Sequence, residues 1–163
     1  MLNLNSLNGA DKILLKYAER LLTETTEPLI GAELGIAYGG GVEQIGEIWK
    51  GRGTIYGLDT FEGHPKQLSY SQSSHEAYCM DLQYERYGTE KLSYEYQRSE
   101  LDKKGLSNVI LKKGLINEKS LSDVPYLNYV LLDLDMVNPM FVAFTIVDPL
   151  IKSGGYLCLH DVT

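Results

Sequence analysis

A short apolar stretch that runs straight into a glycine cluster constrains the fold of this chain more than any other feature. Residues 28–34 read Pro-Leu-Ile-Gly-Ala-Glu-Leu, and residues 35–41 read Gly-Ile-Ala-Tyr-Gly-Gly-Gly. Over residues 42–49 the apolar period then becomes that of a helix. Strand, tight turn and helix in this order place unpaired backbone N–H groups where a ligand can approach the main chain. The segment therefore predicts a nucleotide-like ligand; a turn that only reverses the chain is the alternative.

The order of residues inside the turn narrows the predicted ligand. A dinucleotide fingerprint reads Gly-x-Gly-x-x-Gly, whereas here Glu33 takes the place of the first glycine and is followed by Gly35 and Gly39. A carboxylate at this point disfavours a pyrophosphate and favours a ligand that carries an amino group. S-adenosylmethionine (SAM) is such a ligand, and it is the cofactor that the turn predicts.

A second carboxylate follows at the end of the next strand pattern, residues 54–59. This strand ends on Asp59, roughly twenty residues beyond the glycine cluster, a spacing typical of a contact to both ribose hydroxyls of a nucleotide. Neighbouring parallel strands bring their carboxyl ends to one crevice, so Asp59 and the glycine turn are predicted to share a ligand. The alternative is that Asp59 serves only as a helix N-cap or turn residue.

Composition limits the classes of protein and partner. With 163 residues, 44% of them apolar, the chain is predicted to form one domain over residues 1–163. The net charge of −7 argues against a nucleic-acid or anionic membrane partner. Cys79 and Cys158 lie far apart without metal-ligand spacing, which predicts reduced thiols and a cytoplasmic location. Because no apolar run reaches eighteen residues, neither a membrane span nor a signal peptide is expected.

Outside the two motifs, strand and helix patterns alternate. Helices are expected at residues 11–23, at 120–124, and from Asn138 and Pro139 until Pro149, and further strands are expected at 108–114, 126–135 and 155–160. Residues 64–104 are expected to form a mobile loop and then a helical lid or insertion. Its tyrosines could line an acceptor pocket, form a subunit interface or simply pack: Tyr70, Tyr78, Tyr84, Tyr87, Tyr94 and Tyr96. This alternation predicts an α/β fold with a doubly wound, mostly parallel Rossmann-like sheet of about five strands.

Acidic residues and a histidine close the last two predicted strands. Asp133 and Asp135 follow one strand, and His160 and Asp161 follow the other. Since both strand ends open on one face of the sheet, we expect these four side chains to form a catalytic floor. Ordinary strand-end caps are the alternative.

Four segments of the chain resemble class I SAM-dependent methyltransferases and, within them, the macrocin O-methyltransferase family, which methylates hydroxyls on deoxysugars. The segments are residues 32–40, 57–65, 132–135 and 153–161. The run Asp-Thr-Phe-Glu-Gly-x-Pro at residues 59–65 is the most specific of them. The resemblance implies an enzyme that transfers a methyl group from SAM to a hydroxyl of a small molecule.

Several site residues are implied by this resemblance. The implied cofactor-binding set is Glu33, Gly35, Ala37, Tyr38, Gly39, Asp59, Thr60, Phe61 and Asp133. The implied catalytic set is Asp133, His160 and Asp161, with Asp133 and Asp161 as ligands of a magnesium ion beside the acceptor hydroxyl.

The chain also departs from the family pattern. The family shows two adjacent aspartates where this chain has His160 and Asp161, and a tyrosine where it has Val137. An imidazole is a poor magnesium ligand, so the substitution puts the metal in doubt. His160 is instead a candidate general base, because its intrinsic pKa suits proton removal near neutrality.

Two functions from different classes follow. One is an O-methyltransferase that acts on a sugar or another hydroxylated, natural-product-like acceptor. The other is a SAM-binding or adapter domain that is shortened or degenerate and has no methyl-transfer activity. Class I methyltransferases carry a C-terminal β-hairpin beside strand five, and this chain is expected to lack it. We therefore expect strand five to be a bare edge, with a homodimer formed through it or through the tyrosine-rich helices.

Overall fold

The computed structural model of the chain describes residues 9–63 and 90–160. Helices and strands alternate along it as the sequence predicts, except that no helix stands between the third and fourth strands. In chain order the elements are α1 (Gly9–Glu24), β1 (Leu29–Leu34), α2 (Gly40–Ile48), β2 (Gly53–Asp59), the 3-10 turn η3 (Glu90–Leu92), α4 (Tyr94–Lys103), β3 (Val109–Lys113), β4 (Leu127–Leu132), α5 (Val137–Val147), the 3-10 turn η4 (Asp148–Leu150) and β5 (Ile151–Leu159).

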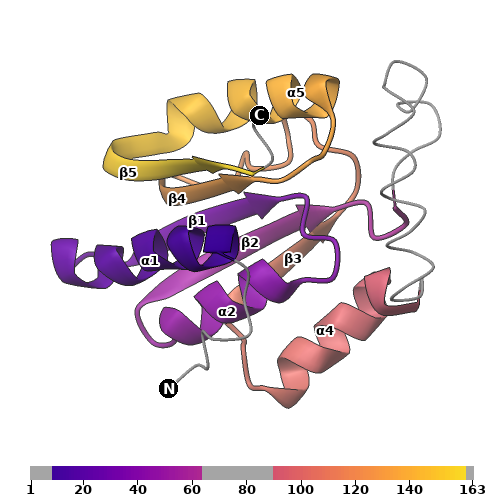
Figure 1. The fold of residues 1–163 in the computed structure, drawn as a ribbon, viewed down its shortest axis with the longest axis horizontal. Helices are drawn as coiled ribbons and strands as arrows, with labels where there is room; N and C mark the ends of the chain where they lie inside the picture. Colours follow the sequence, from indigo (N-terminus) through magenta and orange to yellow (C-terminus); the bar gives the residue numbers. More distant parts are fainter. Residues whose placement is uncertain (1–8, 64–89, 161–163) are drawn as a thin grey trace.

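The strands of the described residues form one sheet in the order β3-β2-β1-β4-β5, and every neighbouring pair is parallel. Figure 1 shows α5 on one face of this sheet and α1, α2 and α4 on the other. The chain builds outward from β1 to β3, then returns to the other side of β1 with β4. This confirms the predicted doubly wound α/β fold. It also makes the junction of β1 and β4 the topological switch point, where ligands bind in such sheets.

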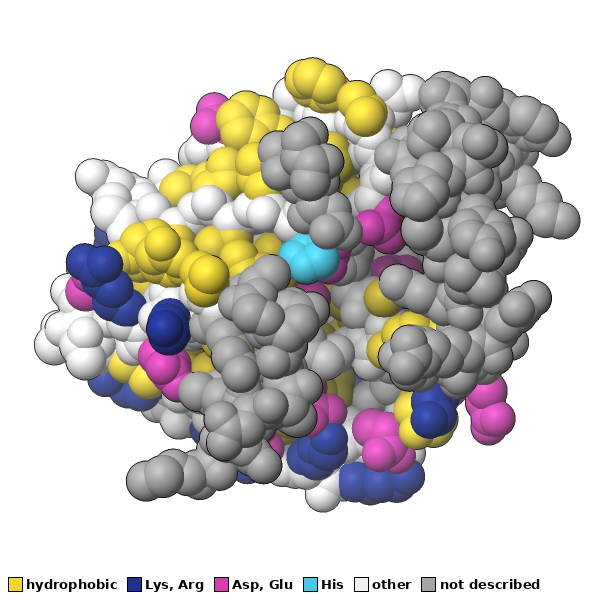
Figure 2. Space-filling view, viewed as in Figure 1, with side chains coloured by type: hydrophobic (Ala, Val, Ile, Leu, Met, Phe, Trp, Pro, Cys, Tyr) yellow, Lys and Arg dark blue, Asp and Glu magenta, His cyan; other side chains and the backbone are white. Residues whose placement is uncertain are grey.

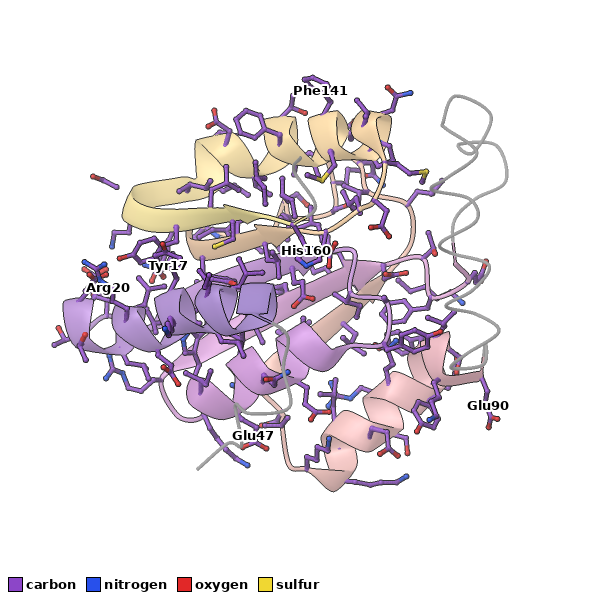
Figure 3. The ribbon with its side chains drawn as sticks, in the orientation of Figure 1. Tyr17, Arg20, Glu47, Glu90, Phe141 and His160 are labelled. Carbon is purple, nitrogen blue, oxygen red and sulfur yellow. The ribbon has the colours of Figure 1, made fainter. Side chains whose placement is uncertain are left out.

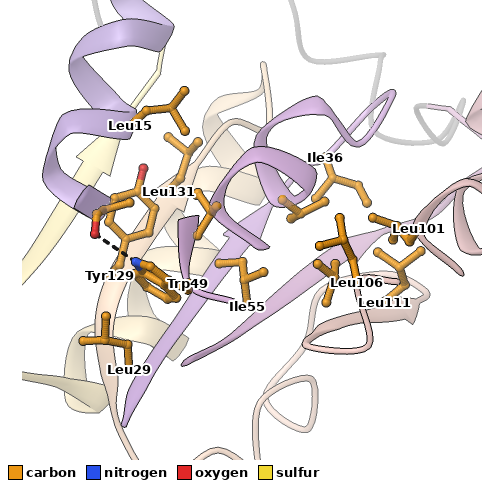
Figure 4. Packing of buried hydrophobic residues seen from close by; sticks show 14 of the residues in the cluster. Leu15, Leu29, Ile36, Trp49, Ile55, Leu101, Leu106, Leu111, Tyr129 and Leu131 are labelled. Atoms are coloured by element: carbon orange, nitrogen blue, oxygen red, sulfur yellow. Dashed lines mark hydrogen bonds between the residues drawn. The ribbon is translucent and has the colours of Figure 1, made fainter. Parts of the chain in front are cut away.

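Two apolar clusters hold the helices to the sheet. Because side chains alternate along a strand, β4 sends Tyr129 to the α1 and α2 side and Val130 to the α5 side. On the first side the indole of Trp49 is fully buried, and its Nε1 donates a 2.8 Å hydrogen bond to the carbonyl of Ala18 in α1 (Figure 4). The Trp49 ring also meets the edge of Tyr129 at a centroid distance of 6.1 Å. Trp49 therefore joins α1, α2 and β4 at one point.

One edge of the sheet and the helix beside it carry exposed apolar side chains. Among the described residues no strand pairs with the outer edge of β5, and Leu159 on that strand is exposed. On α5 the Phe141 ring is 68% exposed and points away from the sheet (Figure 3). Figure 2 shows hydrophobic side chains gathered over this part of the surface. Among the described residues, the outer edge of β5 is therefore bare, as predicted. The homodimer stays a prediction.

Strand β5 begins earlier than the sequence predicts. The expected strand covers residues 155–160, because the glycines and polar residues before it look like a turn, but pairing starts at Ile151 opposite Leu127. The next pair joins Tyr129 to Tyr156, so β5 uses more residues than β4 between the two pairs and forms a bulge. Gly154 takes a left-handed φ of 83° within this bulge. Glycine therefore interrupts the strand locally without ending it.

Two predicted helix features are wrong. Residues 120–124 form successive turns with bonds such as Val124 N–H to Leu121 C=O, and no helix. Pro125 explains this, because the residue before a proline is disfavoured in the helical region. The helix expected to start at Asn138 begins at Val137 instead, with Met136 as its N-cap.

The helix expected at residues 11–23 is α1, which is slightly longer, and α5 ends before Pro149 as predicted. Of the expected lid or insertion at 64–104, α4 crosses from β2 toward β3 and buries Leu101 in the core. Residues 64–89 lie outside the described part. Within the described part, no helix is both long enough and apolar enough to cross a membrane.

Candidate functional site

The carboxyl ends of four strands bring the predicted site residues into one row. Leu34 of β1 is in register with Leu58 of β2 and Leu132 of β4, and Leu132 is in register with Leu159 of β5. The residues that follow these four leucines are therefore neighbours, in the order Asp59, Gly35, Asp133 and His160. With neighbouring strands about 4.8 Å apart, the row spans about 15 Å. Leu34, Leu58 and Leu132 pack on the α5 side of the sheet, and Leu159 is in register with Leu132. Because side chains alternate along a strand, the residues that follow these leucines face the α1 and α2 side.

The glycine turn is left-handed at three alternate positions. Gly35 has φ 86°, Ala37 has φ 44° and Gly39 has φ 75°. At Gly35 a side chain is impossible, because a Cβ there would overlap the backbone carbonyl of Asp133. The turn thus brings the backbones of β1 and β4 into contact at the switch point. Gly39 then caps α2, the first turn of which offers backbone N–H groups at the same edge of the sheet.

Asp59 binds the glycine turn from the side of β2. Its Oδ2 accepts hydrogen bonds from the N–H groups of Ile36 and Ala37, at 2.9 and 3.1 Å, and its Oδ1 accepts one from Phe61 N–H at 2.8 Å. The Thr60 hydroxyl donates to Gly63 C=O at 2.7 Å, closer than its 3.3 Å approach to Asp59. A carboxylate has about four acceptor positions, two on each oxygen. Asp59 therefore holds the turn, and these three bonds leave one acceptor position on Oδ1; its contact to the ribose hydroxyls stays a prediction.

Glu33 lies inside the site, behind the first turn of α2. The residue is 4% exposed, and a Cβ at Gly41 would overlap its carboxylate. A carboxylate beside a helix N-terminus is stabilised by the helix dipole. Beneath it, burial above all raises the pKa of the Tyr129 phenol, and the nearby Cys158 and Glu33 act in the same direction. Burial likewise raises the pKa of the Cys158 thiol. The Tyr129 phenol and the Cys158 thiol near Glu33 are thus kept neutral.

Asp133 and His160 meet at the ends of β4 and β5. Nδ1 of His160 lies 3.1 Å from Oδ1 of Asp133, a distance at which a protonated imidazole and a carboxylate form an ion pair. Both side chains are partly open, at 22% and 32% exposure. Figure 3 shows His160 at the end of β5, beside β4. Both side chains are therefore partly accessible from solvent at the strand ends.

The place of Asp135 and Asp161 in the predicted catalytic floor stays a prediction. Asp135 is exposed and takes a left-handed φ of 56° in the turn before α5. Asp161, predicted as catalytic and as a metal ligand, lies outside the described residues. Within residues 9–63 and 90–160, no three His, Cys, Asp or Glu side chains come together as a metal site. Asp133 with an imidazole neighbour does not fit magnesium, which prefers oxygen ligands.

Of the other predicted cofactor contacts, Phe61 has mainly a packing role in the structure. Its ring is 4% exposed and meets the edge of Tyr94 at a centroid distance of 5.3 Å, so it fixes the loop after β2 to α4. Tyr94 thus takes part in packing, and a role of the tyrosines in an acceptor pocket or interface stays a prediction. Thr60 closes the same loop through Gly63, and Tyr38 is half-buried between Ala37 and Gly39. Cofactor contacts of Phe61, Thr60 and Tyr38 stay predictions.

Sequence reasoning missed Gln97 of α4. Its side chain is 4% exposed, and its Nε2 donates a 2.5 Å hydrogen bond to the carbonyl of Ala37 in the glycine turn. The signal was weak but present: Gln97 is spaced by helical intervals from Tyr94 and Leu101, so it interrupts the stripe of α4 that faces the core. A polar residue at a core-facing position of a helix needs a partner, and here the partner is the turn.

Solved structures share this fold, whereas no protein-family model and no curated protein matches the sequence. The O-methyltransferase NovP is similar over 93% of this chain, with a TM-score of 0.72 and 19% identity. The calicheamicin methyltransferase CalS11 is similar over 91%, with a TM-score of 0.66 and 16% identity. Fibrillarin from Aeropyrum pernix, solved with natively bound S-adenosyl-L-methionine, is similar over 88%, with a TM-score of 0.53 and 16% identity.

The chain spans 64%, 61% and 52% of the lengths of NovP, CalS11 and fibrillarin. The likeness shows that it has the Rossmann-like α/β fold of these methyltransferases.

Proposed function

We propose that this chain binds SAM along the row of strand ends and transfers its methyl group to a hydroxyl of a small acceptor. The observation that carries the proposal is the convergence of Gly35, Asp59, Asp133 and His160 at one edge of the sheet, beside the switch point. At Gly40 nothing lies within 4 Å of the point where a Cβ would stand, so a ligand can approach the backbone there, and Asp59 keeps one acceptor position for a ribose hydroxyl. Glu33 supplies negative charge for the amino group at the other end of the turn.

Bound SAM supplies an electrophilic methyl group on a sulfonium centre. The acceptor hydroxyl oxygen forms a bond to that methyl carbon while the carbon–sulfur bond breaks, and the hydroxyl proton must be removed. In the proposed mechanism His160 takes this proton at Nε2, while Asp133 lies 3.1 Å from Nδ1 and stabilises the imidazolium that results. A positioned base of this kind contributes about 10²- to 10⁴-fold in rate.

Deoxysugars are the acceptor class we propose. The macrocin resemblance of residues 57–65 supports this class. It is also supported by CalS11, described as a TDP-rhamnose 3'-O-methyltransferase in calicheamicin biosynthesis, which has the same fold. The net charge of −7 supports the proposal that nucleic acid is not the acceptor. The proposed mechanism gives magnesium no role, because Asp133 with a neighbouring imidazole does not suit an ion that prefers oxygen ligands.

Calorimetry with SAM and with S-adenosylhomocysteine, with and without magnesium, tests cofactor binding. Transfer of labelled methyl groups to nucleotide-linked deoxysugars then tests the reaction. Binding with turnover supports an O-methyltransferase. Binding without turnover for any hydroxylated acceptor supports the SAM-binding or adapter domain, and tighter binding of NAD than of SAM would end the proposal.

We further propose that two copies associate through β5 and α5. Within residues 9–63 and 90–160 no strand pairs with the outer edge of β5, and side chains such as Phe141 and Leu159 are exposed nearby. Both features support association, because backbone groups and apolar surface at an edge favour pairing with another chain. Light scattering of the wild type and of Phe141→Glu tests it. A wild type that is monomeric at micromolar concentration contradicts it.

A further inference from the structure

We propose that Gln97 is a positioning residue of the cofactor site, which holds the glycine turn in the conformation that receives the aminoacyl end of SAM. The identity of the ligand rests on the function proposed above. The positioning itself rests on contacts between α4 and the turn, which are independent of any ligand.

Two side chains fix Ala37 from opposite sides. Asp59 accepts a hydrogen bond from its N–H at 3.1 Å, and Gln97 Nε2 donates one to its C=O at 2.5 Å. Ala37 takes a left-handed φ of 44°, which costs a residue with a Cβ about 1 to 2 kcal/mol. Strained backbone of this kind persists where its surroundings over-determine it, and it gathers at ligand sites. Of the two side chains that restrain the backbone of Ala37, Asp59 stands at the end of a strand and Gln97 stands on a helix.

The same amide also ties the turn to η3, which lies just before α4. Besides Ala37, Nε2 of Gln97 approaches the carbonyls of Lys91 and Leu92 at 3.4 and 3.3 Å, and these belong to η3. Three surrounding carbonyls settle the orientation of the amide, since its other atom, Oε1, accepts and cannot donate. The turn and η3 are thus held by one NH₂ group.

The carbonyl oxygen of Gln97 shows that folding alone does not favour glutamine here. Oε1 is buried and has no hydrogen-bond partner, and it lies 2.6 Å from the point where a Cβ of Gly39 would stand. A buried acceptor without a partner costs about 1 to 3 kcal/mol. Methionine has nearly the same shape without that cost, so the gain from glutamine must lie in the conformation of the turn.

The decisive variant is Gln97→Met, with Gln44→Met as its matched control. Gln44 also donates to a carbonyl next to the turn, that of Gly40, but from a half-buried position on α2. Binding of three ligands is measured by calorimetry: SAM, S-adenosylhomocysteine, and 5'-methylthioadenosine, which lacks the aminoacyl end. Amide hydrogen exchange over residues 36–40 and the thermal midpoint are measured without ligand.

For Gln97→Met we expect about tenfold weaker binding of SAM and S-adenosylhomocysteine, the effect of one lost hydrogen bond, with 5'-methylthioadenosine changed less than about twofold. Exchange over residues 36–40 should be faster, and the thermal midpoint should stay within about 4 °C of wild type. Gln44→Met should match wild type throughout. The loss should be smaller when Ala37→Gly accompanies Gln97→Met, because glycine adopts positive φ without a restraint.

Equal weakening of all three ligands, or unchanged exchange in the turn, would overturn the proposal. So would an equal loss with and without Ala37→Gly, because Gln97 would then act other than through Ala37. If wild type binds none of the ligands, the proposed function fails, and hydrogen exchange still decides whether Gln97 holds the turn.

Discussion

Nδ1 of His160 lies 3.1 Å from Oδ1 of Asp133, across the ends of two adjacent parallel strands. The backbone sets this pair, because His160 N–H donates to Leu132 C=O and Asp133 N–H donates to Leu34 C=O, each within 3.0 Å. The two side chains therefore leave the sheet from fixed neighbouring points and need no loop to bring them together. Sites supported by strand ends in this way are more precise than sites carried by loops.

His160→Gln is expected to lower methyl transfer by at least about 10²-fold in any assay in which wild type turns over, because the amide cannot take the acceptor proton. SAM affinity should be unchanged, since His160 closes the end of the row opposite Asp59. Asp133→Asn should also lower turnover, because it removes the negative charge beside Nδ1. Steady-state rates and calorimetry measure the two effects. Full activity in His160→Gln would exclude it as the base.

Asp59→Ala is expected to destabilise the fold as well as to weaken SAM. It leaves the N–H groups of Ile36, Ala37 and Phe61 without their charged acceptor, and we expect a loss of about 2 to 4 kcal/mol in urea unfolding. The control is Asp123→Ala, which removes a surface pair with Lys112 and should change stability by less than about 1 kcal/mol. If Asp59→Ala weakens SAM but leaves stability intact, Asp59 is a ligand contact and not a turn residue.

Most of the fold could be predicted because local signals agree with the tertiary structure. The glycines at positions 35 and 39 mark a turn that only residues tolerant of positive φ can make, and the change of apolar period marks α2. The start of β5 could not be predicted, because residues 152–155 have the composition of a turn and are paired only because β4 lies beside them. Packing overrides propensity there.

For the site, strand-end reasoning placed Asp133 beside His160 and Asp59 beside the glycine turn, since adjacent parallel strands share an edge. It could not reveal that Asp59 is already engaged by backbone N–H groups. It also could not find Gln97, which lies 60 residues from Ala37 and reaches it only because α4 packs beside the turn. Contacts between distant segments leave little trace in a single sequence.

Trp49→Phe is expected to lower the free energy of unfolding by about 1 to 3 kcal/mol. The variant removes the buried hydrogen bond from Nε1 to Ala18 C=O, which ties the end of α2 to α1. Because Trp49 is the chain's one tryptophan, circular dichroism in urea measures the variant, while tryptophan fluorescence can follow the others. An unchanged unfolding midpoint would mean that α1 is held by apolar contacts alone.

Stability is expected to fall above about pH 9 to 10, where the buried Cys158 thiol and Tyr129 phenol would ionise in the unfolded chain. Burial raises the pKa of both groups in the folded state, so the folded chain keeps protons that the unfolded chain releases. Unfolding is then favoured by rising pH, by up to about 1.4 kcal/mol per pH unit for each group. Below these pH values the contribution is fully present. Urea unfolding between pH 7 and pH 11 measures the slope.

Tyr129→Phe should make the decline above pH 10 shallower by about one such group. It should change stability little at pH 7, because the hydroxyl makes a long 3.4 Å contact with Leu14 C=O and a hydrogen bond with the Cys158 thiol, which is a weak hydrogen-bonding group. Tyr126→Phe is the control, since that hydroxyl lies at the surface and donates to Pro28 C=O; its slope should match wild type. If Tyr129→Phe leaves the alkaline slope unchanged, the Tyr129 phenol gains access to solvent in the folded state, and the region near Glu33 is not closed to water.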